Sequence, residues 1–188
     1  VSGGVVAFSY NFFKGIMPYR LATNLPGREF DMYRAQGRTV WQDRINLTNP
    51  QKETLYRRLM WNSEPENLEY DYQYFFDNCT TRVRDYIDEA LGGSVFENNQ
   101  GETDRTFRDL VRSHYASVAL IAFSLDVLMN SNIDRPVSEW EEMFLPLSLR
   151  QRLSALTSDV SEDGVVLPLL SDHQVIMEFP PPTAQSSG

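Results

Sequence analysis

The sequence predicts an α+β fold, because two different hydrophobic periods meet at a single junction. Before the junction, aromatic residues recur at every second position, as on one face of a strand: Tyr70, Tyr72, Tyr74 and Phe76. After it, apolar residues recur at helical spacing as far as Gly92-Gly93: Val83, Ile87, Ala90 and Leu91. A chain of 188 residues, of which 41% are hydrophobic, is long enough for one core with an appendage.

Short elements are expected ahead of this junction. Residues 28–35 are predicted to form a helix, and residues 39–47 an edge or mixed strand whose faces are not cleanly separated. A longer helix should begin at Asn49-Pro50, with the asparagine as N-cap and the proline at the first helical position. Its expected inner stripe is Leu55, Leu59 and Met60.

The pattern after Gly93 predicts helices. Residues 103–114 should form one, with an inner face of Phe107, Leu110 and Val111. The apolar run 117–129 is interpreted as a buried helix, because it falls short of the roughly 20 residues that span a bilayer. Ser138 and Glu141 have the spacing of a capping box.

The C-terminal part should contain a last strand around residues 164–166 and a disordered tail from Phe179 onward, where three prolines precede small polar residues. The chain is therefore expected to have three parts. Residues 1–93 would hold the strand-to-helix junction, residues 94–156 would form a helical C-terminal extension packed on it, and residues 157–188 would be a strand and tail.

Cys79, the single cysteine, falls in the first turn of the helix that follows the junction. Asn78 is a favourable N-cap, and the unpaired N–H groups and positive dipole end of a helix favour a thiolate, as does a nearby Arg82. The junction is therefore a candidate nucleophile site. The alternative is that Cys79 is a small buried hydrophobic residue, and that Arg82 only pairs with Asp85, three residues later.

Four stretches of the chain have a recognisable order and spacing. They are Phe12-Phe13-Lys14-Gly15 with Tyr19-Arg20-Leu21, then residues 33–38, residues 70–85 around Asn78-Cys79-Thr80-Thr81-Arg82, and residues 140–146. Together they resemble the Lnb N-terminal periplasmic domain family, a bacterial envelope group of poorly defined activity, and the likeness spans residues 11–156.

The resemblance implies a circularly permuted papain-like (NlpC-type) domain that acts as a thiol hydrolase or acyltransferase on an envelope amide, ester or lipid-like substrate. Cys79 would be the nucleophile, and its amide or the Asn78 side chain would contribute to an oxyanion site. Arg82 and Arg38 occupy matched positions, where they would neutralise a substrate carboxylate or an oxyanion. Tyr72 would line the substrate groove.

The resemblance also implies a catalytic histidine in a Gly-His pair on a strand that precedes the cysteine. Both histidines of this sequence, His114 and His173, follow Cys79, so we expect the catalytic histidine in a segment upstream of Val1. We predict that neither His114 nor His173 approaches the sulfur. The rival function is a noncatalytic envelope accessory protein that binds a partner or lipid in the same groove.

Composition excludes several other classes of function. The 17 basic and 26 acidic residues give a net charge of -9, which argues against nucleic-acid binding. One cysteine excludes an internal disulfide and offers no zinc spacing, so no metal and no cofactor are expected. No transmembrane segment or leader is recognised in the sequence, and the resemblance implies a periplasmic or cell-envelope location.

Overall fold

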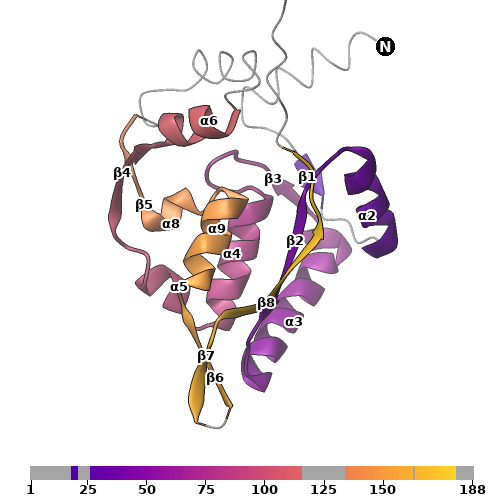
Figure 1. Ribbon diagram of the computed structural model, residues 1–188, viewed down its shortest axis with the longest axis vertical. Helices are drawn as coiled ribbons and strands as arrows, with labels where there is room; N and C mark the ends of the chain where they lie inside the picture. Colours follow the sequence, from indigo (N-terminus) through magenta and orange to yellow (C-terminus); the bar gives the residue numbers. More distant parts are fainter. Residues whose placement is uncertain (1–17, 21–25, 116–133, 163, 181–188) are drawn as a thin grey trace, which may run out of the picture. The chain divides into compact units, whose positions relative to one another are not determined.

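The computed structural model describes residues 18–20, 26–115, 134–162 and 164–180, and these belong to two compact units (Figure 1). The first unit is built on Glu69–Leu149, and the second on Arg20–Leu68 together with Arg150–Pro181. This grouping crosses the boundaries expected at residues 93 and 156, and the three-part division into residues 1–93, 94–156 and 157–188 stays a prediction. The predicted helix at 117–129 lies outside the described residues, as does the tail from residue 181 onward.

Both units combine helices with antiparallel strands, which confirms the α+β class. The first unit contains, in chain order, β3 (Glu69–Asp71), α4 (Cys79–Ala90), α5 (Ser94–Glu97), β4 (Glu102–Thr106), α6 (Phe107–Tyr115), β5 (Pro136–Ser138) and α8 (Glu139–Glu142). Two elements lie at the unit boundaries, namely β1 (Pro18–Arg20), which pairs with β3, and α9 (Pro146–Ser154). The permuted papain-like arrangement stays a prediction.

The core of the first unit is an apolar cluster with two aromatic residues packed against it. Its members come from α6, β5 and the segment after α8: Phe107, Leu110, Val111, Val137, Phe144 and Leu145. Tyr74 and Phe75 pack on this cluster from the loop before α4. The predicted inward face of α6 is confirmed, since its three apolar residues are at most 2% exposed.

The described residues between 94 and 156 are less helical than expected. Strands β4 and β5 pair antiparallel, with Glu102 opposite Ser138 and Thr106 opposite Pro136, and Figure 1 shows them side by side. The helix predicted from residue 103 therefore begins only at Phe107. Thr103 donates its hydroxyl to the Val137 carbonyl at 2.9 Å, so the segment before Phe107 is held in the ladder and not in a helical turn.

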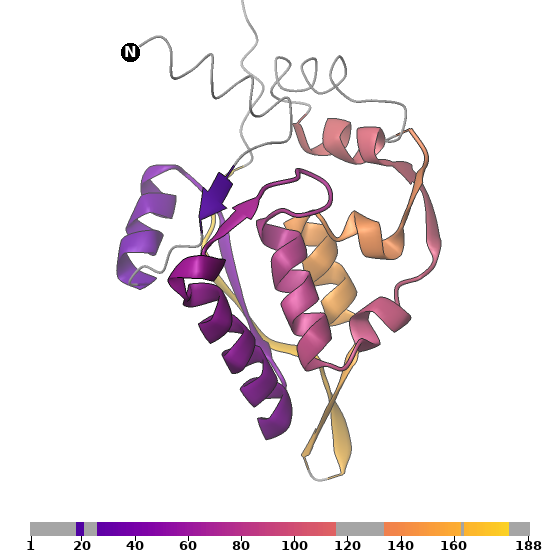
Figure 2. The same cartoon turned by 180° about the vertical axis from the view of Figure 1, so that it is seen from behind.

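The second unit contains α2 (Pro26–Ala35), β2 (Val40–Ile45), α3 (Asn49–Ser63), a 3₁₀ turn (Pro65–Asn67), β6 (Thr157–Glu162), β7 (Val165–Pro168) and β8 (Leu170–Met177). Strand β2 pairs antiparallel with β8, from Val40 opposite Met177 to Ile45 opposite Leu170. Strands β6 and β7 form a hairpin, seen as a narrow ribbon in Figure 2, and Gly164 adopts a φ of +79° at its tip. The strand predicted around residues 164–166 is thus β7, one arm of this hairpin, and β8 follows it.

Helix α3 confirms the predicted start to within one residue but not the predicted inner face. Its N-cap is Thr48, which forms a capping box with Gln51, so the expected cap at Asn49 is wrong. Leu59 and Met60 are 46% and 49% exposed, whereas Asn62 is buried. Leu55, the third member of the predicted stripe, is partly buried, so apolar periodicity indicated the inner face only in part.

Candidate active site around Cys79

The loop before α4 is a closed aromatic turn, not the predicted strand. Strand β3 ends at Asp71, and Gln73 and Asp77 then form an isolated bridge around the turn. Two backbone bonds close it, from the Gln73 N–H to the Asp77 carbonyl at 3.0 Å and from the Asp77 N–H to the Gln73 carbonyl at 2.9 Å. The alternation of aromatic residues does not continue as a strand because Phe75 turns into the core, its ring centroid 4.7 Å from that of Phe107.

Asn78 caps α4, as predicted from its position. Its Oδ1 accepts hydrogen bonds from the backbone N–H groups of Thr80 and Thr81, both at 2.8 Å. The Thr81 hydroxyl in turn accepts the Asn78 N–H at 2.8 Å, so cap and helix satisfy each other. Helix α4 starts at Cys79, where the sequence placed it, and ends at Ala90, two residues before the predicted glycine stop.

The Asn78 side-chain amide also donates hydrogen bonds toward the core, which explains why this residue is buried. Its Nδ2 donates to the Tyr74 carbonyl at 2.9 Å and to the Phe144 carbonyl at 3.0 Å. Both amide hydrogens are therefore in use, and the bond to Phe144 ties the start of α4 to the core. An oxyanion role for this side chain would require one of these buried bonds to break.

Cys79 is exposed, whereas Asn78, Thr80 and Thr81 on either side of it are buried. The interpretation of Cys79 as a buried hydrophobic residue is therefore wrong. The first N–H groups of a helix have no acceptor within the helix. Asn78 satisfies those of Thr80 and Thr81, and within the described part of the chain the structure shows no acceptor for the Cys79 N–H. The exposed thiol and the N–H group without an acceptor thus both belong to Cys79.

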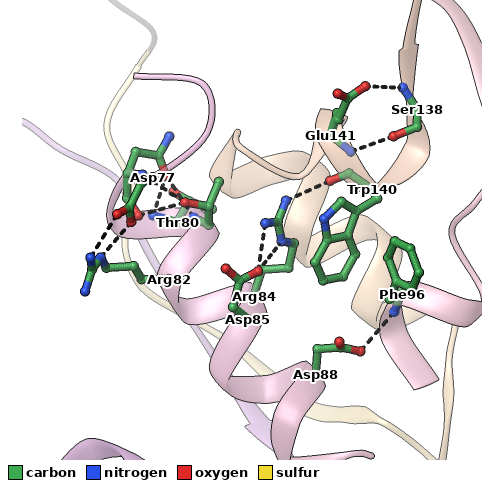
Figure 3. Close-up of polar contacts among 12 residues, drawn as sticks. Asp77, Thr80, Arg82, Arg84, Asp85, Asp88, Phe96, Ser138, Trp140 and Glu141 are labelled. Atoms are coloured by element: carbon green, nitrogen blue, oxygen red, sulfur yellow. Dashed lines mark hydrogen bonds and ion pairs between the residues drawn. The ribbon is translucent and has the colours of Figure 1, made fainter. Parts of the chain in front are cut away.

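Arg82 is held by contacts within its own unit. Its Nε and Nη2 donate to the two carboxylate oxygens of Asp77 at 2.7 and 2.9 Å, as the dashed lines in Figure 3 show. Its Cζ lies 3.6 Å from the Tyr70 ring centroid. Partial burial alone would lower the pKa of Arg82, but hydrogen bonds to Asp77 and Tyr86 outweigh it and raise that pKa. The sequence missed Asp77 as the partner, and the predicted pairing with Asp85 is wrong.

The next arginine of α4 belongs to the packing of the helix. Arg84 is buried, donates to the Trp140 carbonyl at 3.0 Å and lies over the Trp140 ring at 3.8 Å (Figure 3). Its ion-pair partner is Asp85, whose own pKa burial raises. Val83, predicted to face inward, is 49% exposed, so the inner face of α4 is rotated by one residue from the apolar pattern.

The other two predicted binding residues lie in different units. Tyr72 follows β3 in the first unit and is half-buried. Arg38 lies in the second unit, where its guanidinium sits over the Tyr33 ring at 4.7 Å. Roles for Tyr72 and Arg38 in substrate binding stay predictions.

The second unit contains a histidine bonded to a carboxylate. Nδ1 of His173 lies 2.5 Å from Oδ1 of Asp43, and Arg150 donates to both oxygens of Asp43 at 2.6 and 2.9 Å. The hydrogen bond from Arg150 is the main reason why the pKa of Asp43 falls to about 2. Asp172, the neighbour of His173 in the sequence, pairs with Arg44. The His114 side chain lies outside the described residues, and the predicted separation of both histidines from the sulfur stays a prediction.

Comparison with known proteins identifies the family. The chain matches the Lnb N-terminal periplasmic domain over residues 2–114, a range that includes the aromatic turn and the start of α4. No curated protein and no solved structure gave a significant match. The described residues form no helix with the length and apolar character needed to cross a membrane. The match covers more than half of the sequence, and we conclude that this chain belongs to the Lnb N-terminal periplasmic domain family and is a periplasmic, cell-envelope protein.

Proposed function

We propose that this domain is a thiol hydrolase or acyltransferase that acts on an amide or ester in the cell envelope. One observation carries the proposal: the single cysteine is exposed at the first position of a helix whose cap is otherwise fully bonded. A thiol in this position benefits from the positive helix end, and the Cys79 N–H points the same way as the other N–H groups of the first turn, which Asn78 accepts.

The chemistry would proceed in two steps. The Cys79 sulfur attacks the carbonyl carbon of the substrate, a C–S bond forms, and the amine or alcohol leaves with a proton, giving a thioester. The Cys79 N–H is the candidate donor to the oxyanion, since the Asn78 amide is committed to two carbonyls. Water then releases the acid, or an acceptor amine or hydroxyl takes the acyl group. By the family resemblance, a histidine that precedes the cysteine would move the protons.

The test is to trap the acyl-enzyme. The full chain is incubated with a p-nitrophenyl acyl ester, and the intact mass is recorded before and after treatment with neutral hydroxylamine, which cleaves thioesters. We expect one acyl group per chain on Cys79 and none on Cys79→Ala. Absence of the adduct on the folded chain, under conditions in which the urea-unfolded chain is acylated, would refute the proposal.

The rival proposal is a noncatalytic accessory protein of the envelope. It is favoured by the fact that the polar side chains flanking Cys79 are bonded to their own unit, Asn78 to two carbonyls and Arg82 to Asp77. Under this proposal Cys79→Ala would retain full function in cells, whereas the thiol proposal requires its loss.

A further inference from the structure

Asp77 and Arg82 enclose Cys79 along the chain, two residues before it and three after it. Their bond is bidentate, since Nε reaches Oδ1 at 2.7 Å and Nη2 reaches Oδ2 at 2.9 Å. Two parallel bonds of this kind fix the orientation of both side chains as well as their distance. The pair therefore links Asp77, the closing residue of the aromatic turn, to the first turn of α4 (Figure 3). Cys79 lies between the two in the sequence.

The guanidinium is also held from a second side. The Tyr70 ring in β3 lies under it, 3.6 Å from Cζ to the ring centroid, so strand, turn and helix converge on one side chain. The Arg82 side chain is only 27% exposed, which limits its freedom further. A lysine has neither the planar fork nor the flat face that these two contacts use.

The same contacts weaken the case for Arg82 as the anchor of an anionic substrate. Asp77 neutralises its charge and occupies the Nε–Nη2 edge of the guanidinium, one of the two edges that can form a bidentate bond with a carboxylate. We propose that Arg82 is a positioning residue, clamped by Asp77 and Tyr70, which holds the Cys79 turn, and that the acyl group attacked there is uncharged. This inference rests on the proposed role of Cys79 as the nucleophile.

The experiment measures alkylation of Cys79 in the full chain by neutral iodoacetamide and by anionic iodoacetate. Because the chain has one cysteine, intact mass gives the rate at that site directly. The variants are Asp77→Asn, Arg82→Gln and Arg82→Lys. If the pair positions the turn, each variant slows both reagents about fivefold, the range expected when the influence of a helix end is lost. The ratio of the two rates should then stay within about twofold of wild type.

Asp77→Asn separates positioning from simple charge attraction. Removing this carboxylate would speed iodoacetate if Arg82 acted by its charge, but would slow both reagents if the clamp matters. Restoration of the iodoacetate rate by Arg82→Lys, or rates within twofold of wild type in all variants, would overturn the proposal. Acylation of the wild type by the ester is a separate readout, so failure of the thiol function would not be confused with failure of the clamp.

A matched control exists in the same unit. Arg135 is likewise bonded through two nitrogens to one carboxylate, that of Glu141, and lies over an aromatic ring, that of Phe107 at 5.6 Å. Arg135→Gln should lower the thermal midpoint of unfolding by about as much as Arg82→Gln does. It should leave the rates of alkylation of Cys79 by both reagents unchanged. Equal slowing in Arg135→Gln and Arg82→Gln would show that the rates follow overall stability, and would overturn the assignment.

Discussion

Replacing Asn78 with alanine should be among the most destabilising changes in the first unit that leave its apolar core intact. The variant removes the helix cap and both donors to the Tyr74 and Phe144 carbonyls. Loss of a cap costs about 1 kcal/mol, and loss of each of the two hydrogen bonds from Nδ2 costs about 1 kcal/mol more. The expected loss is therefore about 3 kcal/mol in the free energy of unfolding.

Two further variants separate these contributions. Asn78→Asp keeps the capping oxygen but cannot donate, and it brings a negative charge to the Tyr74 and Phe144 carbonyls, so most of the loss should remain. Ser138→Ala removes only the cap of α8, where the serine hydroxyl accepts the Glu141 N–H at 3.1 Å, and should cost about 1 kcal/mol. Asn78→Ala is thus expected to exceed Ser138→Ala by about 2 kcal/mol.

The measurement is urea unfolding followed by circular dichroism, with the slope compared between variants to check that the same transition is observed. Equal losses in Asn78→Ala and Ser138→Ala would refute the reasoning, because the bonds to Tyr74 and Phe144 would then contribute nothing. Full stability of Asn78→Asp would refute it as well.

Three other changes have calculable outcomes. The folded pKa of Asp43 is lowered to about 2, so its ion pair with Arg150 stabilises the second unit above pH 4. The contribution is at most about 2 kcal/mol, because solvent screening reduces it. The free energy of unfolding, measured as the pH is lowered, should show the loss of this contribution between about pH 4 and pH 2. Phe75→Ala should lower the free energy of unfolding in urea by about 3 kcal/mol, since the Phe75 ring contacts the core. Phe76→Ala should lower it by only about 1 kcal/mol, because Phe76 is 53% exposed. Gly93→Ala should cost about 1 kcal/mol by the same assay because Gly93 has a φ of +92°, and an unchanged midpoint would contradict this.

The parts of the site that could be predicted from sequence are those decided within one helical turn. Asn78 caps the N–H groups two and three residues ahead, so its role follows from its residue type and from where the helical period starts. The Ser138 box at α8 was predictable for the same reason. Burial of Phe107, Leu110 and Val111 follows from helical spacing alone, even though the helix starts later than expected.

The partner of Arg82 could be identified only from three-dimensional geometry. Asp85 and Asp77 are both close in sequence, and helical spacing favours the former. Side chains on a helix lean toward its N-terminus, however, and near the first turn this direction brings Arg82 to the residues before the helix. The contact between His173 and Asp43 joins residues 130 apart, and no local pattern carries information about it.

The residue types at positions 78 and 79, at the start of α4, have different explanations. Serine or aspartate would cap the helix, but neither can donate two hydrogen bonds to the Tyr74 and Phe144 carbonyls, so the asparagine at position 78 is explained by folding alone. The cysteine is not explained in this way. It is exposed, it lies outside the core cluster, and alanine would satisfy the backbone of a first helical turn equally well. Under the proposed function, the reacting groups would therefore be the Cys79 thiol and its N–H, and Asn78 and Arg82 would contribute by holding that turn in place.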